Sequence, residues 1–163
     1  MFEFIDPDAR VPFTSPRFEG VTFHLRPIPS GKWIALRNAS ILEVERARRR
    51  AVSELVAEKA DPSSMVGSLT LEALRANLDP ASSEELSRLN AEIVRWGVDS
   101  VEGATFRGAP LELAKEPVEH EGVRLQVLTY EAVRVLSLQR GLLLELSNRL
   151  WALNDLGTVE KKS

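Results

Sequence analysis

The stretch at residues 91–108 constrains the fold of this chain most, because a helical pattern ends there and an extended pattern begins. Leu89, Ile93 and Trp96 recur at helical spacing, and Gly97 follows them directly. Glycine takes the left-handed conformation that closes many helices at little steric cost. We therefore expect a helix that stops at Gly97 and leaves Trp96 at a corner of the fold.

The residues after this corner favour an extended chain with tight turns. Val98, Val101 and Phe106 are strand formers, while Gly103 and Gly108 supply the permissive backbone that bends need. We interpret the stretch as the junction between a helical first half and a helical last third of the chain. The predicted structural junction residues are Trp96, Gly97 and Gly108.

The remaining pattern predicts a mostly α fold with a small antiparallel β element, which is an α+β class. A long helix comes early, short helices and a hairpin follow, and a long helix ends the fold. The two extended pieces of the hairpin meet at a Glu-His-Glu-Gly turn, and the hairpin can add to the first strand. The predicted elements are a strand at 21–26, helices at 32–59, 70–78 and 82–96, a hairpin at 118–128 and a final helix at 129–154.

The chain length of 163 residues suits one folded domain, which we place at residues 21–156. Residues 1–20 contain three prolines among four phenylalanines, a composition that excludes a helix of any length. They are predicted to form an extended arm, which either packs on its own domain or docks on a neighbouring subunit. Residues 157–163 are predicted to be a flexible tail.

Composition narrows the class of function. The formal net charge is −3, whereas a general nucleic-acid binder usually carries a basic excess. The absence of cysteine removes disulfides and thiolate metal sites and fits a reducing cytosol. The amino end lacks the pattern of a secretory signal, and no apolar run approaches the roughly 20 residues that cross a bilayer. These features predict a cytosolic protein without a membrane segment.

Residues that could carry chemistry are few and scattered. His24 and His120 lie far apart in the sequence, and neither has a companion ligand at helical or turn spacing. A glycine spacing like that of a phosphate loop occurs once, but Ala109-Pro110 follows it where a Lys-Ser/Thr pair is needed. The sequence therefore predicts no enzyme activity, no catalytic residue, no metal site and no cofactor.

Four arginines lie close together in the long early helix. Glu45 lies four residues before Arg49, and Arg50 lies four before Glu54, spacings that pair opposite charges on an exposed helix face. We interpret the cluster as solvated or facing a subunit, with nucleic-acid contact as the alternative. The four residues are Arg46, Arg48, Arg49 and Arg50.

The predicted final helix is apolar on more than one face. A stripe that includes Val133, Leu136 and Leu150 is core by default, while other leucines add apolar groups elsewhere. Such a helix is either buried at the centre of the fold or shared with a partner. For the second interpretation, the candidate partner-binding residues are Leu142, Leu146 and Trp151, together with Phe2 and Phe4 of the arm.

A series of short motifs runs through residues 86–136. A valine, a tryptophan and a glycine precede a loop that contains aspartate, glycine and proline, and a Thr-x-Glu helix start follows. The residues are Val94, Trp96, Gly97, Asp99, Gly108, Pro110 and Thr129-Tyr130-Glu131. This series resembles the tail assembly chaperones of long-tailed bacteriophages. One departure is residues 112–128, a longer link between the turn and the last helix than that family usually has.

The resemblance implies a non-enzymatic protein that acts in the host cytoplasm during virion assembly. It would bind the tape measure protein, recruit tail tube subunits, self-associate and be absent from the finished particle. Two other hypotheses stay open. One is a structural virion protein, as a tail or head-tail connector component, and the other is a nucleic-acid-binding regulator that uses the arginine cluster.

Overall fold

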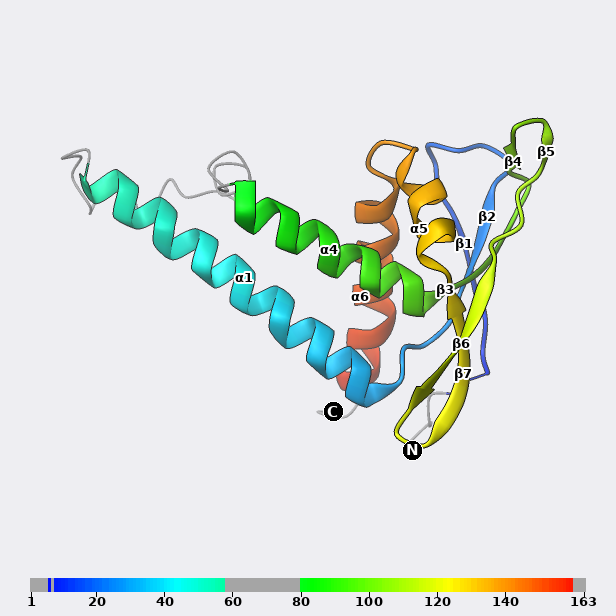
Figure 1. Cartoon of the computed structure of the whole chain (residues 1–163), viewed down its shortest axis with the longest axis horizontal. Helices are drawn as coiled ribbons and strands as arrows, with labels where there is room; N and C mark the ends of the chain where they lie inside the picture. The colour runs from blue at the N-terminus through cyan, green and yellow to red at the C-terminus, as the bar shows by residue number, and fades with distance from the viewer. Residues whose placement is uncertain (1–5, 7, 58–79, 160–163) are drawn as a thin grey trace. The chain divides into compact units, whose positions relative to one another are not determined.

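The computed structural model describes residues 6, 8–57 and 80–159 of the chain (Figure 1). Within these residues, four helices and three small antiparallel sheets form an α+β fold, which confirms the predicted class. The predictions that lie outside the described residues concern Phe2, Phe4, the short helix at 70–78 and the end of the tail.

The chain divides into two compact units, which are described separately. The first unit combines residues 1–34 with residues 90–163, and the second comprises residues 35–89. Both boundaries fall inside helices, α1 (Ser30–Ala57) and α4 (Pro80–Gly97). A division within a continuous helix leaves no linker in the sequence, so the pattern of residues predicts one domain instead.

A three-stranded antiparallel sheet, in the order β1-β2-β3, lies in the first unit. β1 (Val11–Thr14) pairs with β2 (Thr22–Leu25), which in turn pairs with β3 (Val98–Glu102). Phe23 and Leu25 are buried because alternate residues of a strand face the same side. The predicted first strand is therefore confirmed, and the second half of the expected arm is an edge strand of this sheet.

Helix α4 runs directly into β3, so the corner predicted at Trp96 is confirmed. The predicted left-handed closure at Gly97 is wrong, because none of the positive φ angles falls on this glycine. Arg26 closes the helix instead: its backbone N–H donates to the Gly97 carbonyl at 2.8 Å and its Nε to the Trp96 carbonyl at 3.1 Å. These bonds satisfy carbonyls that a helix end leaves without partners.

The absence of a side chain at Gly97 has a different reason. A Cβ at this position would overlap the side chain of Leu150, which is fully buried. Gly97 thus allows the end of α4 to approach α6 (Leu142–Val159) closely. The glycine is required by packing, whereas the sequence pattern suggested a requirement of the backbone.

Two hairpins follow the corner. In the first, β4 (Thr105–Phe106) pairs with β5 (Ala109–Pro110), and in the second, β6 (Lys115–His120) pairs with β7 (Val123–Leu128). Each has two turn residues with positive φ, the second of them a glycine, as type I′ turns require. The second hairpin was predicted, but its addition to the first strand is wrong, because β6 and β7 form a sheet of their own.

The predicted final helix is two helices, so the prediction of one continuous helix is wrong. α5 (Tyr130–Ser137) begins at the predicted cap, where the Thr129 hydroxyl accepts from the backbone N–H of Ala132 at 3.1 Å. The chain then breaks at Gly141, which has a φ of +80°, before α6 begins. Each helix buries its own face, which explains why the combined stretch looks apolar all round.

The core of the first unit gathers around α6. Leu142, Leu146, Leu150 and Asn154 form a row four residues apart, and all are buried. Asn154 accepts from the backbone N–H of Ile28 at 3.1 Å and donates to the Leu150 carbonyl at 2.7 Å. Other buried apolar residues of this unit are Phe23, Leu25, Ile28, Trp33, Ile93, Val94, Trp96, Val98, Val127, Leu128, Ala132, Val133 and Leu136.

The second unit contains the α1 residues after position 34 and the α4 residues before position 90. One side of this part of α1 is buried, and the Ser40 hydroxyl on that side donates to the Leu36 carbonyl at 2.9 Å. The buried residues are Leu36, Ser40, Ala47 and Ala51 of α1 and Leu89 of α4.

Candidate protein-interaction surface

Two of the residues predicted to bind a partner lie in the core of the fold. Leu142 is 3% exposed and Leu146 is 0% exposed, so the expectation that they form a surface is wrong. The reason is the four-residue row of α6, which faces the core of its unit. Trp151 is half-buried, and its ring packs edge-on against Trp33 with centroids 4.9 Å apart.

Of the nine large apolar side chains that are exposed among the described residues, four lie on the long helix α1. Ile41 is 43% exposed and Leu42 is 51% exposed, and neither was a candidate in the sequence. Both lie outside the buried row of the same helix. The sequence shows apolar residues on more than one side of this helix. Helical periodicity alone does not indicate which of these sides is covered by other segments and which is exposed.

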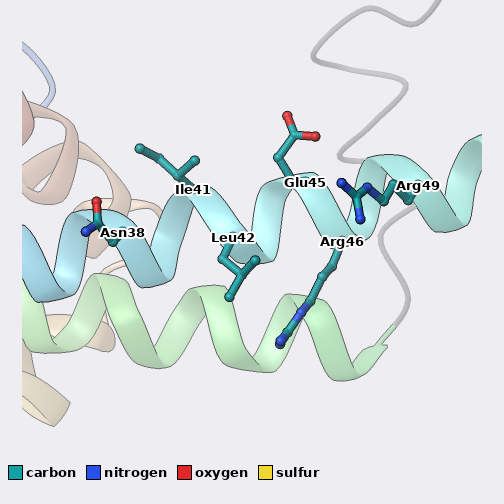
Figure 2. A pocket seen from close by; sticks show the side chains of 6 residues that line it. All are labelled: Asn38, Ile41, Leu42, Glu45, Arg46 and Arg49. Atoms are coloured by element: carbon teal, nitrogen blue, oxygen red, sulfur yellow. The ribbon is translucent and has the colours of Figure 1, made fainter.

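The side chains of Ile41 and Leu42 line an open depression of about 340 Å³ on α1. Its lining residues belong to two neighbouring rows with a spacing of four: Asn38, Leu42 and Arg46 in one, and Ile41, Glu45 and Arg49 in the other. Figure 2 shows Ile41 and Glu45 directed to one side of the helix and Leu42 and Arg46 to another. We name this depression between the two rows the α1 groove.

Charged side chains border the α1 groove. Arg46 pairs with Glu43 at 2.7 Å and Arg48 with Glu45 at 3.8 Å, both three residues apart. Glu45 thus pairs with Arg48, and the predicted pairing with Arg49 is wrong. Arg49 has no ion-pair partner among the residues that the structure describes. These pairs neutralise part of the arginine cluster that the sequence suggested as a nucleic-acid contact.

A second charged cluster connects the corner to the second hairpin. The Arg95 side chain is almost fully buried; its Nε donates to the Leu128 carbonyl at 3.0 Å, and its Nη2 donates to the Glu116 carboxylate. Its guanidinium also lies 4.2 Å from the centre of the Tyr130 ring. A hydrogen bond to Glu92 and the charge of that carboxylate raise the pKa of Tyr130. Arg95 therefore joins α4 to β7 and α5 as a structural element.

Asp99, one of the motif residues, has a comparable role on β3. It pairs with Lys115 at 2.6 Å and with Arg10 at 3.3 Å, which links three segments of the first unit. Burial alone would raise the pKa of Asp99, but the hydrogen bonds and positive charges of Lys115 and Arg10 hold it below its usual value.

The two histidines both lie on strands. His24 is on β2 with its Nε2 3.4 Å from Glu102, and His120 ends β6 with its ring edge-on to Trp96. In the described part of the chain, no group of three or more His, Asp or Glu side chains is arranged to hold a metal ion. None of the described helices combines the length and apolar character that spanning a membrane requires.

Gly108, the third predicted junction residue, has a φ of +82° and occupies the turn of the first hairpin. Together with Trp96 and Gly97 it marks where the chain changes direction. These motif positions are thus explained by the fold. Comparison with known proteins adds nothing to this: no family model, no characterised protein and no solved structure matches the chain.

Proposed function

We propose that this chain is a non-enzymatic chaperone of phage tail assembly, which binds the tape measure protein and recruits tail tube subunits in the host cytoplasm. The observation that carries the proposal is the α1 groove, where Ile41 and Leu42 leave apolar surface in contact with water. Removing such surface from water favours association by roughly 25 cal/mol per Å² before the costs of association.

The motif series at residues 86–136 supports the specific form of the proposal. Its members Trp96, Gly97 and Asp99 lie at the corner between α4 and β3, where they organise the fold. Because these residues shape the fold, the resemblance to the tail assembly chaperones concerns the fold and not a binding surface. The binding surface itself lies elsewhere, on α1, where partner specificity can differ between related proteins.

Co-expression with a tape measure protein and a tail tube protein tests this function. The tagged chain is expected to co-purify with the tape measure protein and to increase its soluble fraction. Leu42→Asp places a charge in the α1 groove and should reduce both effects, while Gln126→Asp, at an exposed position on β7, should leave them unchanged. No co-purification and no gain in solubility with the unmodified chain would refute the proposal.

Mass spectrometry of purified particles separates the chaperone from a structural virion protein. A chaperone is absent from the finished tail, whereas a tail or connector component is present at a fixed number of copies. Detection of the chain in purified virions would therefore replace the proposal with the structural alternative. The proposed self-association is measured by sedimentation velocity over a range of protein concentrations.

A further inference from the structure

We propose that the α1 groove binds a helix of a different protein, and that this helix carries carboxylates beside its apolar stripe. The inference rests on the proposed function in one respect, since it names the surface and the kind of partner segment through which the chain binds. Its geometric part stands on the residues of α1 alone.

The shape of the α1 groove indicates a helical occupant. Side chains four apart form ridges on a helix, and the groove lies between two such ridges. A partner helix packs by placing one of its own ridges into a groove of this kind, most commonly with the axes crossing at about −50°. Ile41 belongs to one of these ridges and Leu42 to the other, so the inserted ridge meets an apolar side chain on each border of the groove and must be apolar at that point.

The charges around the groove indicate the sign of the partner. Residues 43–50 contain four arginines and two glutamates, which gives this segment a net charge of +2 in a chain of net charge −3. Arg46 and Arg48 have carboxylate partners within α1, whereas Arg49 has none among the described residues. A carboxylate on the partner helix would complete that pair at the edge of the apolar contact.

The same charges disfavour a second copy of the chain as the occupant. Two copies that met through this groove would bring two segments of charge +2 together, and like charges at an interface are unfavourable. An acidic partner helix meets the groove with opposite charge and steers its own approach. We therefore assign the groove to a different protein, and any self-association of the chain to another surface.

Two designed peptides test the inference on the full chain. Both are labelled helices of 21 residues with the same leucine stripe; one has glutamates beside the stripe and the other has lysines. Fluorescence anisotropy is expected to show binding of the acidic peptide and weaker binding of the basic one. Leu42→Ala should weaken the acidic peptide at least about tenfold. Val44→Ala is the control, because Val44 is 43% exposed but does not line the groove.

A charge reversal tests the role of Arg49. Arg49→Glu should weaken the acidic peptide about threefold and strengthen the basic peptide by a similar factor, as for an exposed ion pair. Circular dichroism checks that each variant is folded. Equal binding of the two peptides, absence of binding at millimolar concentration, or equal effects of Leu42→Ala and Val44→Ala would overturn the inference. So would a dimer of the chain that Leu42→Ala dissociates.

Failure of the inference and failure of the proposed function give different results. If the tape measure protein is captured but Leu42→Ala, Arg49→Glu and Val44→Ala all leave capture unchanged, the groove is not the binding surface and the function stands. If the acidic peptide binds as expected but no tape measure protein is captured, the groove stands and the function is refuted.

Discussion

Truncation of Leu146 to alanine is the sharpest test of the core described for α6. Leu146 is 0% exposed and belongs to the buried row of the helix, whereas Leu144, two residues earlier, is 39% exposed. The two substitutions remove the same atoms from the same helix. Any difference between their effects on stability therefore reports which face of α6 is covered.

The expected magnitudes follow from burial. Leu→Ala in a closed core costs about 2–5 kcal/mol, because the lost transfer free energy is joined by the cost of the cavity. For Leu146 we expect about 3 kcal/mol. Leu144→Ala opens no enclosed cavity and removes a side chain that is already partly in water, so about 1 kcal/mol is expected. For a chain of this size, the larger loss corresponds to a decrease in Tm of about 6–12 °C.

Urea unfolding followed by far-ultraviolet circular dichroism measures both losses. The midpoint of Leu146→Ala should fall well below that of Leu144→Ala, with similar slopes of the free energy of unfolding against urea concentration. Equal losses, or a larger loss for Leu144→Ala, would show that α6 presents a different face to the core. In that case the interpretation of Leu146 as a partner-binding residue would return.

Two further pairs of substitutions and one single substitution test other parts of the first unit. Gly103→Ala should destabilise the fold by more than Gly108→Ala. Both glycines have positive φ, but only at position 103 would a Cβ overlap a backbone carbonyl. Equal decreases in Tm would contradict this expectation. Arg95→Met should cost about 2–4 kcal/mol of unfolding free energy, because it removes the donor to the carbonyl of buried Leu128 and the ion-pair partner of Glu92 and Glu116. Arg134→Met, in an exposed ion pair, should cost less than about 1 kcal/mol. Similar midpoints in urea would refute the structural role of the buried arginine. Because the pKa of Asp99 is lowered in the fold, its contribution to stability is complete above the ordinary carboxyl pKa of about 3.9 and is lost as the pH falls through the lower folded value. Between pH 5 and pH 3, Asp99→Asn should therefore lose less unfolding free energy than the unmodified chain. Equal losses in the two proteins would contradict the assigned pairing.

The local signals in the sequence predicted much of the fold. The cap at Thr129, the corner at Trp96 and the turn glycine of the second hairpin depend on residues next to one another in the chain. Interactions of this kind are decided by backbone preference and nearby hydrogen bonds. The sequence therefore placed most helices and strands within a few residues of their observed bounds.

These local signals could not predict the candidate site. Leu142, Leu146, Ile41 and Leu42 are all apolar residues on helices with more than one apolar face. Helical periodicity groups residues into faces, but the choice of the buried face depends on which distant segments pack against it. The prediction therefore selected two core residues of α6 and passed over the exposed pair of α1.

The sequence by itself determined the class of structure, the order of its elements and the absence of cysteine chemistry, since these depend on composition and short spacing. Only the tertiary structure decided that Arg26 closes α4, that Gly97 makes room for Leu150 and that β3 pairs with β2. In each case the partners are separated by 50 or more residues, and their contact is selected by the packing of the whole unit. Within the second unit, packing likewise covers one side of α1 and leaves the α1 groove exposed, so the fold decides which apolar residues form that surface.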